Sequence, residues 1–178
     1  MTRYQLAKIV SWADPLQTRK RLQKVVFMLQ AAGCPLGADF TLHHYGPYSE
    51  EVSRLTDELV RLNLLKETAE ENSVGQQFSY QLSEDVGEKL GQLERTERGR
   101  QMAAQMAPFE GLARNLLRAD LKDLELAATV VYFRRQGHDW AQAVEKACTF
   151  KSITANSPPA ARAEKVARSV EEPVRKPA

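Results

Sequence analysis

One amphipathic segment, followed by two short alternating ones, constrains this fold most strongly. Between residues 49 and 62, apolar side chains recur at the three- and four-residue spacing of one helix face. The stripe consists of Val52, Leu55, Leu59 and Leu62. Ser49 can cap the helix, and the carboxylates of Glu50 and Glu51 favour its positive end. The segment therefore predicts a helix that buries one face against the rest of the chain.

Two extended stretches come directly after this helix. The first begins at Leu64, and the second alternates Phe78, Tyr80 and Leu82 with polar residues, as half-buried strands do. Residues 70–77 between them are polar and include a glycine, which is typical of a loop. Together they predict a β-hairpin with a loose tip.

Two helices and a short strand are expected before the amphipathic helix. Residues 4–13 and 18–32 show helical spacing of their apolar side chains, and Gly33 ends the second segment. Residues 40–45 alternate as a strand does, and Gly46-Pro47 follows as a turn pair. Helix, helix, short strand, helix and hairpin is the element order of a winged helix. We therefore predict an α+β, mainly α-helical fold with a winged-helix-like core and a β-hairpin wing.

A helical half is expected after the wing. Its first helix begins near Val86 and continues past the charged stretch 94–100 toward Met106, until Pro108 breaks it. Three further helical segments follow before about residue 150. The sequence thus predicts one domain over residues 1–155, a winged-helix-like core with a helical extension.

The composition changes from about Asn156 onward. Prolines gather there and aromatic residues are absent, so this segment offers little apolar surface to bury. Residues 156–178 are therefore predicted to form a disordered tail, and the alternative is a partner-binding segment with a transient helical face.

Composition limits the class of protein. The chain has 178 residues, 43% of them hydrophobic, which suffices for a core without disulfide or metal support. Cys34 and Cys148 are too few for a disulfide framework and are expected to be buried thiols in a reducing, cytoplasmic setting. We expect no membrane span, because the charge-free stretches are shorter than the roughly 20 residues required, and no secretory signal.

Charge is distributed unevenly along the chain. The net charge is only +2, but residues 1–30 and 151–178 are basic, whereas the body between them is acidic. Two basic ends therefore flank an acidic body, and any partner proposed for this chain has to fit that charge distribution.

The sequence offers little material for catalysis. His43 and His44 are neighbours on a predicted strand and would point to opposite faces, so they cannot easily hold one metal ion. Phosphate-binding loops, dinucleotide fingerprints and nucleophile elbows are absent from the sequence. We therefore expect no enzyme activity, no cofactor and no metal site.

Two motifs together resemble a known family. Residues 21–30, Arg-Leu-Gln-Lys-Val-Val-Phe-Met-Leu-Gln, are similar to the opening helix of Panacea-domain proteins, which include SocA-like antitoxins and uncharacterised phage-associated proteins. Residues 44–52 are similar to that family's Tyr-Gly-Pro turn and the helix after it, and residues 124–132 resemble a C-terminal helix of YwgA-like bacterial relatives. The resemblance implies a compact helical protein around a winged-helix-like core and, in some members, neutralisation of a toxin by direct binding.

Protein binding is therefore the predicted function, as an antitoxin-like or adaptor protein, with a toxin as one such partner. DNA binding by a winged-helix transcriptional regulator is the alternative. It is less favoured because the third helix, which usually reads the major groove, carries more acidic than basic residues. The sequence does not specify the partner or the oligomeric state.

Five residues are predicted to contact the partner: Arg19, Arg21, Lys24, Tyr45 and Tyr48. Arginine suits the capture of carboxylates, and rigid tyrosine rings give contact area at low entropic cost. The short connection between the second helix and the Tyr-Gly-Pro turn is expected to bring the two groups together. A solvated helix start and a packed structural turn are the alternative interpretations.

Overall fold

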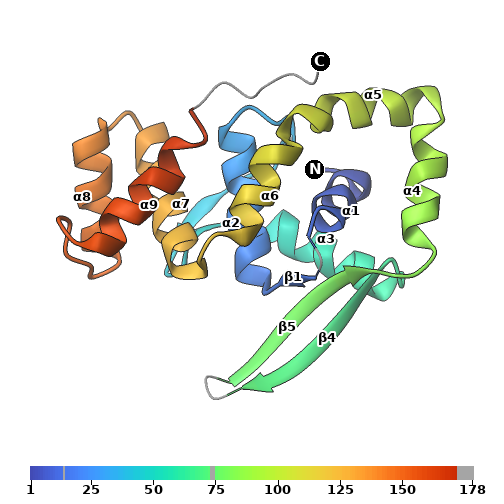
Figure 1. The fold of residues 1–178 in the computed structure, drawn as a ribbon, viewed down its shortest axis with the longest axis horizontal. Coiled ribbons are helices and arrows are strands. Elements are labelled where there is room, and N and C mark those ends of the chain that lie inside the picture. Colours follow the sequence, from blue (N-terminus) through green and yellow to red (C-terminus); the bar gives the residue numbers. More distant parts are fainter. Residues whose placement is uncertain (14, 73–74, 172–178) are drawn as a thin grey trace.

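The winged-helix order predicted from the sequence is present in the computed structural model, which describes residues 1–13, 15–72 and 75–171 (Figure 1). The core elements are α1 (Arg3–Ser11), β1 (Leu16–Gln17), α2 (Arg19–Ala31), α3 (Glu50–Arg61), β4 (Leu65–Asn72) and β5 (Gly75–Leu82). The antiparallel sheet has the order β1-β5-β4, so the two-residue strand β1, which the pattern did not predict, joins the wing to the helices. The winged-helix-like core and its wing are confirmed.

Helix α2 is the central element of this core. Every residue from Leu22 to Leu29 is buried, because the helix contacts α3 and β1 of the core and also helices of the helical half. It ends at Ala31, two residues before Gly33, whose φ of 98° is a conformation that glycine adopts easily. The N–H groups of Gly33 and Cys34 donate to the carbonyls of Gln30 and Leu29, which closes the helix in a Schellman motif.

A second, small hairpin lies between α2 and α3. Strand β2 (Thr41–His43) pairs with β3 (Gly46–Tyr48), and the turn is made by His44 and Tyr45. The prediction of a turn at Gly46-Pro47 is therefore wrong by two residues. Gly46 is required for packing instead, since a Cβ there would lie 2.8 Å from Thr129 Oγ1 on the neighbouring helix α7 (Leu121–Arg135).

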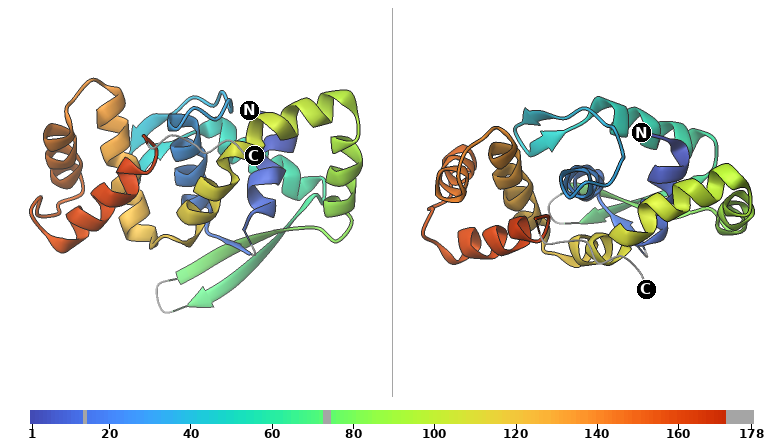
Figure 2. Two further views of the ribbon diagram at one scale, coloured as in Figure 1. Left: turned by 45° about the horizontal axis from the view of Figure 1, so that its top comes forward. Right: turned by 90° about the horizontal axis from the view of Figure 1, so that it is seen from above.

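The wing is longer than the sequence suggests. The polar segment 70–77, predicted as a loop, is paired up to Asn72 and Gly75, so the strands continue almost to the tip. Polar side chains suit these strands because the far end of the hairpin extends away from the helices into solvent (Figures 1 and 2).

The helical half begins with a break that the sequence pattern did not predict. Instead of one helix to Met106, α4 (Val86–Glu94) and α5 (Glu97–Met106) meet at Arg95 and Thr96. Thr96 caps α5, and Gly99 packs so closely on α4 that a Cβ there would lie 1.9 Å from the Leu93 carbonyl oxygen. Pro108 ends α5 as expected, within a short 3₁₀ turn, η1 (Ala107–Phe109).

The remaining helices pack on α7. Helix α6 (Glu110–Arg118) leads into α7, and α8 (Trp140–Phe150) follows it. Every residue of α7 from Leu126 to Val131 is buried, because α2, β3, α8 and the final helix all contact this helix. It thereby connects the helical half to the core.

The predicted disordered tail is wrong for the residues that the structure describes. Pro158–Arg168 form a helix, α9, which begins with the cap residue Ser157 and packs on α7 (Figure 2). Its buried side chains are small: Ala160, Ala163 and Ala167. Alanines let two helices approach closely, so α9 packs without the bulky residues whose absence suggested disorder. The rest of the predicted tail, residues 172–178, lies outside the described residues.

The two cysteines, Cys34 and Cys148, are buried free thiols, as expected. Among the described helices, none combines the length and the apolar character that crossing a bilayer requires.

Candidate functional site

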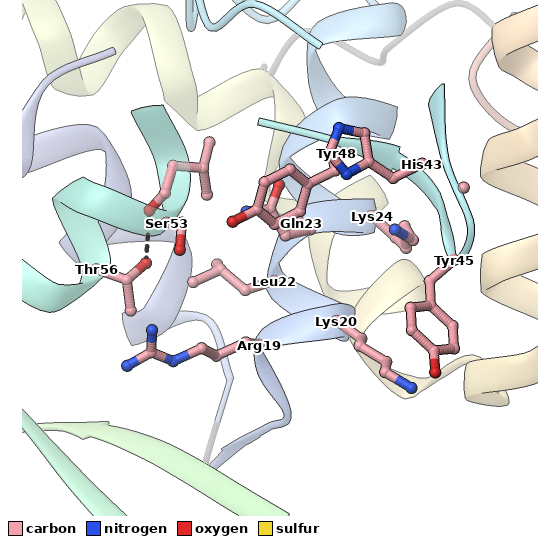
Figure 3. A pocket seen from close by; sticks show the side chains of 12 residues that line it. Arg19, Lys20, Leu22, Gln23, Lys24, His43, Tyr45, Tyr48, Ser53 and Thr56 are labelled. Carbon is pink, nitrogen blue, oxygen red and sulfur yellow. Dashed lines mark hydrogen bonds between the residues drawn. The ribbon is translucent and has the colours of Figure 1, made fainter. Parts of the chain in front are cut away.

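A cleft opens between the first turns of α2, the β2–β3 hairpin and the first half of α3 (Figure 3). Its volume is about 260 Å³. We call it the α2–α3 cleft; it is lined by Arg19, Lys20, Leu22, Gln23, Lys24, His43, Tyr45, Gly46, Tyr48, Val52, Ser53 and Thr56. Cations, aromatic rings and an apolar floor thus face one small space.

A buried amide joins the two walls of the cleft. Gln23 donates from Nε2 to the Ser49 carbonyl at 3.0 Å and accepts from the Ser49 N–H at 2.9 Å. Ser49 in turn accepts from the Val52 N–H and caps α3, as predicted. Because both residues are buried, this reciprocal pair fixes the start of α3 relative to α2.

Lys24 forms the inner wall and is only 2% exposed. Its Nζ donates to the carbonyl of Pro47 at 2.8 Å. Burial lowers the pKa of Lys24 to about 8; the negative charge of Glu125 on α7 opposes this, and the positive charges of Lys151 and Lys20 add to it. The cleft therefore contains a lysine whose ammonium form is poorly solvated.

The exposed ring of Tyr45 stands at the mouth of the cleft. It is 51% exposed, and the Lys20 ammonium lies 3.7 Å from its ring centre. Lys151, just after α8, lies 5.8 Å from the same centre and donates to the carbonyl of His44. Two cations from different parts of the chain thus hold one aromatic ring in place.

The opposite wall and the floor are less polar. Tyr48 is half-buried and its ring stacks on that of His43, with 4.9 Å between the ring centres. Leu22 and Val52, each 1% exposed, form the floor. In Figure 3, Lys24 is seen between Tyr45 and Tyr48.

Arg19 lines the cleft, but internal partners occupy its guanidinium group. It forms ion pairs with Asp57 on α3, at 2.6 Å, and with Glu67 on the wing, at 2.9 Å. It also donates to the hydroxyl of Tyr80. Burial alone would lower the pKa of Arg19, but the hydrogen bonds to Glu67 and Tyr80 raise it above its ordinary value. Arg19 therefore braces the wing against α3.

Arg21 lies on another side of α2, away from the cleft. Its Nη1 donates to the carbonyls of Leu117 and Ala119, at 2.9 Å and 2.6 Å, at the C-terminal end of α6. This arginine thus caps α6 and joins it to α2.

Four of the five predicted contact residues, all except Arg21, therefore line one cleft. The predicted list omitted Lys20, although its i, i+4 spacing to Lys24 places both on one face of α2. Lys151 had no such signal, because only the tertiary fold brings the end of α8 to Tyr45.

A second polar surface lies on α3 and the wing. We call it the α3–wing surface; its exposed charged residues are Glu50, Arg54, Asp57, Arg61, Lys66, Glu70 and Glu71. The carboxylate of Glu58 on the same helix is paired with Arg3. This surface has no excess of positive charge, although α3 is the helix that a winged-helix protein usually places in the major groove.

His43 and His44 do not belong to a metal-binding group. Over residues 1–13, 15–72 and 75–171, no three His, Cys, Asp or Glu side chains come together in a way that could hold a metal ion.

Fold and cleft together define a mainly helical, winged-helix-like protein with a cationic and aromatic cleft beside α2. No protein-family model matches the sequence. The chain is similar to the uncharacterized protein YwgA of Bacillus subtilis (strain 168), with 29% identity over 147 residues, 83% of this chain and 82% of YwgA. This similarity supports the YwgA-like part of the resemblance described above. The Panacea-domain part stays a prediction.

Proposed function

We propose that this protein acts by binding another protein, as an antitoxin-like or adaptor molecule, and that the α2–α3 cleft is its contact site. The observation that carries this proposal is the exposed Tyr45 ring at the mouth of a small cleft, with the ammonium groups of two lysines 3.7 and 5.8 Å from its centre. At about 260 Å³, the cleft is smaller than the roughly 300–1,000 Å³ of sites that bury whole small ligands. Its size fits a side chain projecting from a partner.

The way the ring is held also suits protein recognition. Tyrosine has few rotatable bonds, so a ring that is already positioned loses little conformational freedom on binding. Aromatic residues next to a pocket commonly supply much of the binding energy of an interface. The motifs shared with Panacea-domain proteins support the antitoxin-like version of the proposal.

Charge argues against the two other classes of function. The α3–wing surface lacks the positive excess that phosphate contacts require. The residues that line the cleft in the described chain include no carboxylate and no thiol, the His43 ring stacks on Tyr48, and Lys24 donates to the Pro47 carbonyl, so no nucleophile is hydrogen-bonded to a base among them. The proposal therefore involves no covalent step.

A random-peptide display library tests the proposal directly. Peptides selected on the full chain should bind it, and Tyr45→Ala and Lys20→Glu should each weaken that binding at least tenfold. Leu93→Ala and Lys66→Glu are matched controls, since both residues are exposed and lie outside the cleft. They should bind like the parent.

Two results would contradict the proposal. In the first, no peptide is enriched, or the enriched peptides ignore both cleft variants. In the second, the protein binds one duplex DNA sequence tightly at moderate salt and requires Arg54 or Arg61, which would establish the regulator instead.

A further inference from the structure

Lys24 is the most unusual residue of the cleft. Lysine is rarely buried unless its charge is paired, yet Lys24 is 2% exposed and lies within the run of buried α2 residues from Leu22 to Leu29. Within the described chain, the hydrogen-bond acceptor for its ammonium group is the neutral carbonyl of Pro47. An ammonium group can donate three hydrogen bonds. Two of its protons are therefore available to a ligand that enters the cleft.

The surroundings of this ammonium group are short of negative charge. Lys20 faces it from α2 itself and Lys151 from the end of α8, and both act against its charged form. The carboxylate that favours it is Glu125 on α7, which is also paired with Lys151 at 3.6 Å. Lys24 and Lys151 thus share the carboxylate of Glu125, whereas Arg19 is neutralised by Asp57 and Glu67.

We infer that the α2–α3 cleft takes a carboxylate side chain from an acidic segment of a partner protein, with Lys20 at its mouth and Lys24 at its inner wall. This inference rests on the proposed function and specifies the chemistry of the partner. The apolar part of the same segment packs on Leu22 and Val52 and between the two tyrosine rings.

The shape of the site favours such a segment over a nucleic acid backbone. A duplex presents a regular row of phosphates and is bound by extended basic surfaces. The cleft is instead recessed, its floor is apolar, and the exposed carboxylates of Asp57, Glu70 and Glu71 lie on the adjoining α3–wing surface. A single carboxylate beside an apolar side chain fits both features.

A ligand role for Lys24 predicts a pattern that a purely structural role does not. If Lys24 mainly holds the β2–β3 hairpin through Pro47, then Lys24→Met should lower the melting temperature. If its charge is retained for a ligand, methionine should fill the same space without the cost of burying a charge. In that case Lys24→Met melts at the parent temperature or above it and loses affinity for acidic peptides.

The experiment uses the peptides selected on the full chain and their amide counterparts, in which each Glu or Asp is changed in turn to Gln or Asn. One such change should raise the Kd for the parent at least tenfold, equivalent to about 1.4 kcal/mol. The same change should have little effect on the Kd for Lys24→Met, which shows that the carboxylate and Lys24 interact. Lys20→Met should show an intermediate loss.

A measurement on the unaltered protein provides independent evidence. The ¹³Cε signal of Lys24, followed by NMR against pH, should titrate at higher pH when the acidic peptide is bound and should not move with the amide counterpart. If cleft-dependent peptides lack acidic residues, or tolerate every amide change, the inference is overturned while the proposed function stands. If no peptide depends on the cleft, both fail.

Discussion

The α2–α3 cleft and the α3–wing surface lie next to each other, but their cationic side chains have different kinds of partner. On the α3–wing side, Arg19 and Arg3 are paired with carboxylates of α3 or the wing. In the cleft, Lys20 and Lys24 have aromatic and carbonyl partners. The comparison teaches that a winged-helix scaffold can pair the cations beside α3, the helix that normally reads DNA, with carboxylates. The positive charge that remains available for a ligand then lies on the preceding helix, α2.

The largest effect should come from the scaffold that both regions share. Leu59 is fully buried on α3, so Leu59→Asp places an unpaired carboxylate in the core and should remove more than about 4 kcal/mol of stability. Circular dichroism should show loss of the cooperative transition. Leu62→Asp, at an exposed position one turn later, should cost about 1 kcal/mol or less. Equal effects would mean that the α3 stripe does not face the core.

Removal of α9 should affect the cleft more than the wing. A chain ending at Ala155 leaves part of α7 uncovered and should lose about 2–4 kcal/mol, measured by urea unfolding. Because α7 supports the β2–β3 hairpin, peptide binding should weaken, whereas hydrogen exchange in β4 and β5 should stay near the parent rates. A chain ending at Glu171 keeps α9 and serves as control. An unchanged midpoint in the shorter chain would restore the view of α9 as a dispensable tail.

The buried charge of Lys24 should appear in the pH dependence of stability. Its pKa is about 8 in the folded protein against an ordinary value of 10.5, so between these values the unfolded chain binds more protons at this group. The stability of the parent relative to Lys24→Met should therefore rise with pH across this window, by up to about 3 kcal/mol. A difference that stays flat would mean that Lys24 is better solvated than its burial indicates.

Charge reversal at two neighbouring cations of α2, Arg21 and Lys20, should affect different properties: stability in the first case and binding in the second. Arg21→Glu leaves the carbonyls of Leu117 and Ala119 without their donor and brings a carboxylate near Asp120, so it should cost about 1–3 kcal/mol. Lys20→Glu should change stability by less than about 0.5 kcal/mol, because the residue is exposed. Thermal melts give the first comparison and peptide titrations the second. Loss of binding in a folded Arg21→Glu protein would return Arg21 to the contact site.

The smallest effect concerns salt. The mouth of the cleft is exposed and its inner wall is not, so only the contribution of Lys20 should be screened strongly. Affinity for an acidic peptide should fall a few-fold between 50 and 300 mM NaCl, and the fall should be smaller in Lys20→Met. A steep fall that Lys20→Met leaves unchanged would place the contact on another basic surface.

Local patterns predicted those parts of the fold that local forces determine. The α3 stripe from Val52 to Leu59, its Ser49 cap and the Gly33 stop each depend on residues close together in the sequence, and each is confirmed. Leu62, the last member of the predicted stripe, follows the end of α3 and is exposed, so that part of the prediction is wrong. The break at Thr96 was missed because it depends on how closely Gly99 approaches α4. Helix α9 was missed because its buried surface comes from alanines, which composition counts as weakly apolar.

The candidate site was predictable in part for the same reason. The short connection from α2 to the β2–β3 hairpin brings Lys24, Tyr45 and Tyr48 together, as expected. The internal roles of two arginines could not be predicted from the sequence, because their partners are distant along the chain: Glu67 for Arg19, and Ala119 for Arg21. Sequence thus showed which side chains gather beside α2, but not which of them are already occupied.

The contact between Gly46 and Thr129 has a consequence for how this chain can change over time. A glycine is needed where the β2–β3 hairpin meets α7, so the hairpin that carries Tyr45 is shaped by a helix from the other half of the molecule. The two halves are therefore not interchangeable modules. Transplanting the winged-helix-like core onto a different helical partner would preserve the core topology but remove the α7 contact that positions the hairpin with Tyr45. Selection on the cleft must therefore act on both halves together.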